Sequence, residues 1–148
     1  MKYLYLFLAS MFLFSACKKS EKTKAELLEG DWKLNALTIN PPQVVSGTVI
    51  TDWYTQLLPC DKDNVYTFYN NATYKSDEGA TKCSPSDPQN KSGNWAFLNS
   101  DTQLQLIQLQ DTILYDMIDL NEQELKMNYS GRDTNNILHT YAATFGRL

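Results

Sequence analysis

Residues 95–129 read WAFLNSDTQLQLIQLQDTILYDMIDLNEQELKMNY. Apolar and polar side chains alternate in four short runs of this stretch, which is the pattern of a sheet with one buried face and one solvated face. The runs are separated by Asn99-Ser100-Asp101, Gln110-Asp111 and Asn121-Glu122, which suit tight hairpin turns. The stretch therefore predicts four consecutive antiparallel strands.

The same alternation continues on both sides of this stretch. Runs at 32–36, 66–68 and 141–145, together with a strand near Tyr74, bring the expected number of strands to about eight. Sequential hairpins give an up-and-down order, and eight such strands can close on themselves and remove their exposed edges. We therefore expect an all-β fold, an eight-stranded antiparallel up-and-down barrel.

One segment between the first two expected strands departs from the alternation. Apolar pairs recur at helical spacing across residues 49–58, Thr48 is a candidate N-cap, and Pro59 is a candidate stop. The pattern predicts a short helix of about two to three turns. A helix this short is marginal alone, so its apolar stripe is expected to pack on the barrel, over one end.

The chain begins with the features of an export signal. Lys2 precedes an apolar run of about a dozen residues, too short to cross a bilayer core that needs about 20. The run ends in Leu13-Phe14-Ser15-Ala16-Cys17, which resembles the bacterial lipobox, with Phe14 where that motif usually has Leu. We expect residues 1–16 to be a signal peptide and Cys17 to carry a lipid. The alternative is an ordinary signal peptide cut after Ala16.

Removing the leader leaves about 130 residues, enough for one domain with a single core. We expect residues 17–26 to form a polar, lysine-rich tether and residues 27–148 to form the barrel. The tether lysines are either a solvated spacer or a contact to anionic headgroups. The protein would then be anchored by its lipid at the outer membrane, on the periplasmic face or at the cell surface.

Acidic side chains dominate the expected mature part. Seventeen Asp and Glu face twelve Lys and Arg once Lys2 is removed, a formal charge of about −5. Four of these basic residues lie in the tether, which leaves few on the domain itself. This distribution argues against a nucleic-acid-binding domain, because such domains present clustered basic charge to the phosphates.

Two further cysteines, Cys60 and Cys83, remain in the domain. In an exported protein disulfides form and persist, so we expect a bridge between them. The bridge would pin down residues 79–92, a Pro-, Ser- and Asp-containing stretch that is expected to be a long loop. Zinc is the competing hypothesis, but the chain has one histidine, His139, and no paired Cys-x-x-Cys spacing.

Gly30-Asp31-Trp32 at the start of the first strand and Arg147 near the end of the last resemble the lipocalin hallmark. In that family the arginine lies across the indole and closes the narrow end of the barrel, so the resemblance implies this role for Trp32 and Arg147. The stretch from Cys60-Asp61-Lys62-Asp63-Asn64 through Phe68, Tyr74 and Cys83 to Gly93-Asn94-Trp95 resembles the lipocalin-like lipoproteins of Bacteroidetes. That resemblance implies an eight-stranded barrel, a lipid anchor and no assigned enzymatic activity.

Catalytic and metal-binding patterns are sparse. A hydrolase needs a nucleophile with a positioned base, and His139 shares the phase of the last strand, which favours a structural role. Carboxylates that could gather around calcium are more commonly hydrated turn residues; they are Asp61, Asp63, Asp77, Glu78 and Asp87. We therefore expect no catalytic residue, no metal and no cofactor. Asp111-Thr112-Ile113 resembles an O-glycan acceptor of Bacteroidetes, although a turn entering a strand is the simpler interpretation.

Aromatic residues are more numerous than barrel closure requires. The candidates for lining a ligand cup are Tyr66, Phe68, Tyr74, Trp95, Phe97, Tyr115, Tyr129, Tyr141 and Phe145. One hypothesis is that they surround a small apolar ligand. The alternative is that they fill the barrel, and that the disulfide-braced loop 79–92 makes the protein an interaction or inhibitor module.

Overall fold

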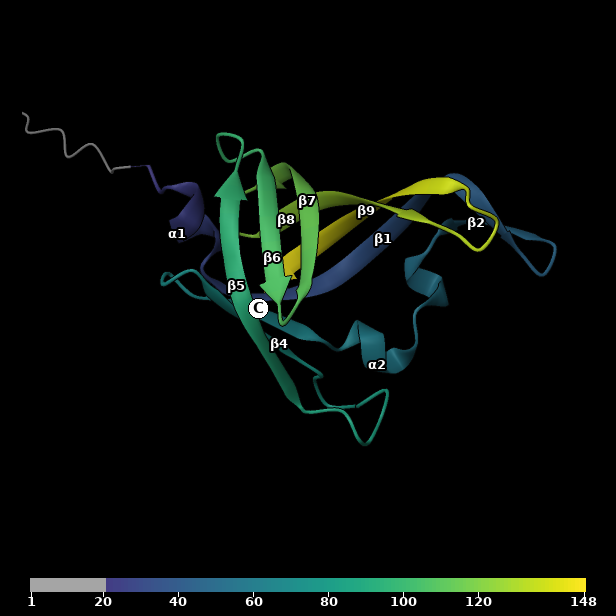
Figure 1. Ribbon diagram of the computed structural model, residues 1–148, viewed down its shortest axis with the longest axis horizontal. Coiled ribbons are helices and arrows are strands. Elements are labelled where there is room, and N and C mark those ends of the chain that lie inside the picture. The colour runs from purple at the N-terminus through teal and green to yellow at the C-terminus, as the bar shows by residue number, and fades with distance from the viewer. Residues whose placement is uncertain (1–20) are drawn as a thin grey trace, which may run out of the picture.

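The structure is a computed structural model that describes residues 21–148 (Figure 1). The expected signal peptide, the lipidation site Cys17 and the first part of the tether lie outside the described residues. Within residues 21–148, no helix has the length and apolar character needed to cross a bilayer.

The described residues form one closed antiparallel barrel. The eight strands of its wall are β1 (Gly30–Val45), β3 (Val65–Phe68), β4 (Thr73–Asp77), β5 (Asn90–Leu98), β6 (Gln103–Gln108), β7 (Asp111–Leu120), β8 (Glu124–Arg132) and β9 (Leu138–Arg147). Each of these strands pairs with the next one named, and β1 also pairs with β9 and closes the barrel. The expected eight-stranded up-and-down barrel is therefore confirmed.

The alternation that predicted these strands is also what builds the core. In β6, Leu104 and Leu106 are buried, while Gln103 and Gln105, which alternate with them, are partly exposed. In β8, Leu125 and Met127 repeat the pattern. Successive side chains of a strand point to opposite faces, so each strand contributes one row to the interior.

The expected helix at 49–58 is wrong in its position. Residues Thr48–Asp52 form a ninth strand, β2, which pairs with the far end of β1 through a turn at Ser46-Gly47 with positive φ at both positions. The β-branched side chains of this segment suit a strand, and the turn glycine tolerates the left-handed backbone. A 3-10 turn, η1 (Tyr54–Gln56), and a short helix, α2 (Pro59–Lys62), follow. Pro59 thus begins a helix instead of ending one.

A short helix, α1 (Lys24–Leu28), covers one end of the barrel. Its N-terminus has a capping box between Thr23 and Glu26, and Leu28 is fully buried in the core. Lys24 donates a hydrogen bond of 2.6 Å to the carbonyl of Asp101 in the β5–β6 turn. Residues 24–26, expected in the tether, therefore belong to the folded domain.

The other end of the barrel is open and its wall is split. Pairing between β7 and β8 stops at Asp116–Asn128, so residues 111–115 and 129–132 make no ladder with each other. In Figure 1, the far parts of β1, β8 and β9 extend with β2 away from β5, β6 and β7. This divergence leaves the interior accessible at the end where α2 and the β4–β5 loop lie.

Candidate ligand-binding site

The barrel interior contains a hollow of about 250 Å³ at its open end. It is lined by Asn64, Tyr66, Tyr74, Ser76, Asp77, Glu78, Lys91, Leu106, Gln108, Ile113 and Tyr115. A smaller cavity of about 40 Å³, lined by Tyr66, Phe68, Leu106, Tyr115, Leu125, Met127 and Phe145, shares three of these residues. We call the two together the cup: the larger hollow is its polar upper chamber, and the smaller cavity is its apolar floor.

The register of the strands determines which residues form the wall of this cup. Tyr66 lies opposite Ser76, and Phe68 lies opposite Tyr74, across the β3–β4 ladder. Leu106 lies opposite Ile113 across the β6–β7 ladder. Directly opposed residues of an antiparallel pair share a face, so the inward rows of four strands meet in one wall.

Three tyrosines dominate the upper chamber. Burial raises the pKa of Tyr66, Tyr74 and Tyr115, and the negative charges of Asp61 and Glu78 raise that of Tyr66 further. The phenols therefore stay protonated at neutral pH, with hydroxyl groups that can donate or accept hydrogen bonds. They present polar tips on an otherwise apolar wall.

The rim of the cup carries charge. Glu78 Oε1 lies 3.7 Å from Lys91 Nζ, and Lys91 also reaches Asp87 Oδ2 at 3.5 Å. Asp77 Oδ1 accepts hydrogen bonds from the Gly79 amide at 3.0 Å and from Gln89 Nε2 at 2.8 Å. Most of this polar lining was not predicted from the sequence, where aromatic character alone marked the candidate lining residues.

The aromatic residues proposed from the sequence fall into three groups. Tyr66, Phe68, Tyr74, Tyr115 and Phe145 line the hollow or its floor.

Trp95 and Phe97 lie deeper, where Trp95 packs edge-on against Phe68 at 6.4 Å and against Phe97 at 5.3 Å. Trp95 Nε1 donates to the Tyr69 carbonyl at 3.1 Å. These two residues therefore belong to the filled part of the core.

Tyr129 and Tyr141 form the third group, on the extension of β8 and β9 beyond the cup. Their rings stack at 4.8 Å, Trp53 packs edge-on against Tyr141 at 5.9 Å, and Tyr115 contacts Tyr129 at 5.7 Å. A surface hollow of about 460 Å³ opens beside Tyr129 where β7 and β8 diverge, and Ile113 lines both this hollow and the cup. Ile113 thus lies between the two hollows.

Trp32 and Arg147 meet at the closed end. The Arg147 guanidinium lies 4.6 Å from the centre of the Trp32 ring system, and Trp32 is fully buried. Arg147 Nη1 donates to the Glu29 carbonyl at 2.6 Å, Arg147 Nη2 donates to the Leu27 carbonyl, and Trp32 Nε1 donates to the Leu28 carbonyl at 2.7 Å. Three successive carbonyls at the end of α1, which the helix leaves unpaired, thus receive side-chain donors.

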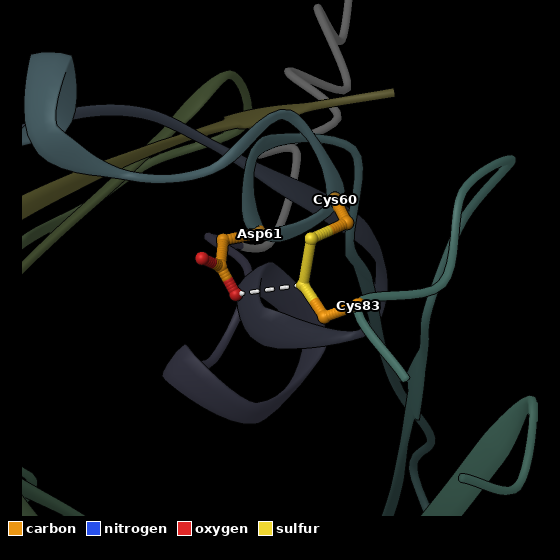
Figure 2. Close-up of side chains that lie close together, drawn as sticks. All are labelled: Cys60, Asp61 and Cys83. Carbon is orange, nitrogen blue, oxygen red and sulfur yellow. Dashed lines mark hydrogen bonds between the residues drawn. A yellow bond between two sulfur atoms is a disulfide. The ribbon is translucent and has the colours of Figure 1, made fainter. Parts of the chain in front are cut away.

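Cys60 and Cys83 form a disulfide with a Cα–Cα distance of 5.2 Å, as expected, and Asp61 lies beside it (Figure 2). Asp61 Oδ1 is 3.4 Å from Cys83 Sγ. A disulfide sulfur carries no proton, so this is a packing contact and not a donated hydrogen bond. The two sulfurs bond each other, which leaves them unable to act as the thiolate ligands that zinc requires.

The carboxylate of Asp63 binds the backbone of the β4–β5 loop. Asp63 Oδ2 accepts hydrogen bonds from the amides of Ala80 and Thr81 at 3.0 and 2.9 Å and from the Thr81 hydroxyl at 2.8 Å. Together with the disulfide, these bonds brace the β4–β5 loop, which spans residues 78–89 because β5 already begins at Asn90.

His139 is buried, with 1 % of its surface exposed. Its Nδ1 lies 2.8 Å from the Pro41 carbonyl, and its Nε2 lies 3.4 Å from Asp133 Oδ2. These neighbours tie the β8–β9 hairpin to β1. Asp111, Thr112 and Ile113 form the start of β7, where Thr112 pairs with Ile107.

No family model matches the chain. No curated protein matches it either. Among solved structures, the complex of bovine odorant-binding protein with undecanal is similar with a TM-score of 0.46 and 12% identity, covering 88% of this chain and 77% of that one. The odorant-binding protein from bovine nasal mucosa gives the same values. The bovine protein in complex with a selenium-containing odorant gives a TM-score of 0.45 at 12% identity, over 88% and 76% of the two chains.

Proposed function

We propose that this protein is a lipocalin-like binding protein that holds a small, largely apolar molecule in the cup at the open end of its barrel. The observation that carries this proposal is the hollow of about 250 Å³ above an apolar floor that includes Phe68 and Met127. Burial of apolar surface would supply most of the affinity, and the tyrosine hydroxyls would orient the ligand. No covalent step is part of the proposal.

The hollow favours a ligand over the alternative of a completely filled barrel. Its volume lies just below the range of about 300–1,000 Å³ that accommodates drug-sized ligands, so a small molecule fits best. Of the aromatic residues that face the core, Trp95 and Phe97 line neither the hollow nor its floor and belong to the filled part.

We further propose that the protein is a lipoprotein of the Bacteroidetes type, anchored at the outer membrane through Cys17. The leader and the lipobox-like sequence that ends at Cys17 support this part of the proposal. Metabolic labelling with an alkyne fatty acid tests it. Wild type should be labelled and Cys17→Ser should not, and equal labelling of both would contradict the anchor.

Thermal unfolding in the presence of small amphipathic compounds tests ligand binding. A ligand present at about 100 times its Kd adds about 2.7 kcal/mol, which should raise the melting temperature of this domain by about 10 °C. Ser76→Trp should fill the cup and abolish the shift, because Ser76 lines it. Ser92→Trp is the matched control, because Ser92 is exposed and lies opposite Lys75 on the outer face. Equal shifts in both variants, or none in wild type across alcohols, amines and acids, would refute the proposal.

A further inference from the structure

Glu78 is the least satisfied charged group of the cup. Its side chain is only 16% exposed, and its nearest cation, Lys91, lies 3.7 Å away, beyond hydrogen-bond distance. Lys91 is shared with Asp87. Among residues 21–148, no hydrogen bond reaches either oxygen of the Glu78 carboxylate. The carboxylate is only partly exposed to water and accepts no hydrogen bond from these residues, so its oxygens are available to donors of a ligand.

A second acceptor lines the same hollow without a partner. Asn64 Oδ1 is buried and forms no hydrogen bond with the described residues, although the Tyr66 phenol lies beside the Asn64 side chain. Buried polar atoms are nearly always hydrogen-bonded in folded proteins, and an unpaired one calls for a specific explanation. Glu78 and Asn64 together give the chamber two free acceptors, one of which carries a full negative charge.

The surrounding groups also favour positive charge. Of the described residues that line the hollow, two are carboxylates, Asp77 and Glu78, and one is an ammonium group, Lys91. The rings of Tyr66, Tyr74 and Tyr115 form much of the remaining wall, and aromatic faces attract cations. Burial raises the pKa of Tyr66, and the nearby negative charges of Asp61 and Glu78 raise it further.

We propose that the cup selects a small amphipathic primary amine, whose ammonium group binds Glu78 and Asn64 while its apolar part rests on the floor formed by Phe68, Leu125 and Met127. This inference rests on the proposed function and narrows it to one ligand class. An ammonium group offers three donors and a positive charge, which match the two free acceptors. A fatty carboxylate would bring a second negative charge next to Glu78, and an alcohol would bring no positive charge to it.

Three ligands with the same six-carbon chain separate these alternatives: hexylamine, hexanol and hexanoate. Isothermal titration on the purified full chain at pH 7 and low salt should give hexylamine a Kd at least tenfold lower than that of hexanol, with hexanoate weakest. Glu78→Gln should remove the preference for the amine and leave the Kd of hexanol unchanged. Glu124→Gln is the matched control, because Glu124 pairs with Lys126 on β8, does not line the cup, and should keep the preference.

The outcomes distinguish this inference from the proposed function. Hexanol binding as tightly as hexylamine to wild type would overturn the amine inference while leaving a ligand-binding cup. Absence of binding by all three compounds would overturn both. The comparison on wild type needs no variant, and Asn64→Asp gives a second test that does not depend on the folding of Glu78→Gln. That variant should bind hexylamine more tightly, and unchanged or weaker binding would contradict the inference.

Discussion

Replacing Arg147 with alanine should destabilise the whole barrel, although the residue lies second from the end of the chain. Its guanidinium donates to two carbonyls at the end of α1 and lies 4.6 Å from the Trp32 ring centre. The substitution removes these contacts together and leaves the carbonyls of Leu27 and Glu29 without their side-chain donors. The closed end of the barrel would lose the group that joins α1 to β1 and β9.

The size of the effect follows from these contacts. Hydrogen bonds to a charged group contribute about 1.5–3 kcal/mol each, and a cation over an aromatic face adds about 0.5–2 kcal/mol. The contributions are not additive because the contacts share one side chain, so we expect a loss of about 3–5 kcal/mol. A domain of this size has a stability of about 5–15 kcal/mol. The melting temperature should therefore fall by about 10–20 °C.

Urea unfolding followed by tryptophan fluorescence measures this loss. Arg147→Lys should lie between wild type and Arg147→Ala, because an ammonium group keeps the charge but not the planar fork. Arg132→Ala is the matched control, since Arg132 donates one hydrogen bond of 2.8 Å to the Asn136 carbonyl in an exposed turn. Its loss should stay below about 1 kcal/mol. If Arg147→Ala and Arg132→Ala unfold at the same urea concentration, the reasoning about the closed end is refuted.

Three further predictions concern other parts of the barrel. Replacing Cys60 and Cys83 together with serine should cost about 3.5 kcal/mol, because the bridge closes a loop with a sequence separation of 23; an unchanged calorimetric melting temperature would contradict this. Gly93→Ala should lower stability by about 1–3 kcal/mol in urea unfolding, because a Cβ there meets the backbone of β6, whereas Gly131→Ala has room and should be nearly neutral. Hydrogen bonds from the β4–β5 loop lower the pKa of Asp63, so its stabilising contribution is present above about pH 4 and is lost as the pH falls through the lower pKa of the folded state. Asp63→Asn should therefore unfold at lower urea than wild type at pH 6, and the two curves should converge at lower pH; a constant difference would contradict the assignment.

The sequence determined the strands of the barrel because alternation is a local property. The rows that contain Leu104 and Leu106, or Leu125 and Met127, mark a buried face whatever the neighbouring strand is. Sequential hairpins and the number of strands then leave closure as the way to remove exposed edges. The cysteine count also paired Cys60 with Cys83, because they were the two cysteines left in a domain expected to be exported.

Tertiary structure determined the conformation of residues 48–52, where the local spacing of apolar residues favoured a helix. The apolar pairs of that segment fit a helical stripe, but β1 continues to Val45 and offers an unpaired edge beyond the barrel. A turn with positive φ at Ser46 and Gly47 folds the chain back onto that edge, and Val49 pairs with Val44. Backbone pairing with a distant part of the fold outweighed a weak helical pattern.

Tertiary structure also decided whether the barrel is hollow. Alternation shows that Tyr66, Tyr74 and Tyr115 face inward, but not how far apart the strands stand at each end. That separation depends on where the pairing between β7 and β8 ends, which is at Asp116 and Asn128. No local sequence pattern determines this point. The sequence by itself thus determined which side chains face the interior. Only the three-dimensional register decided that those at one end are packed together and those at the other surround a space.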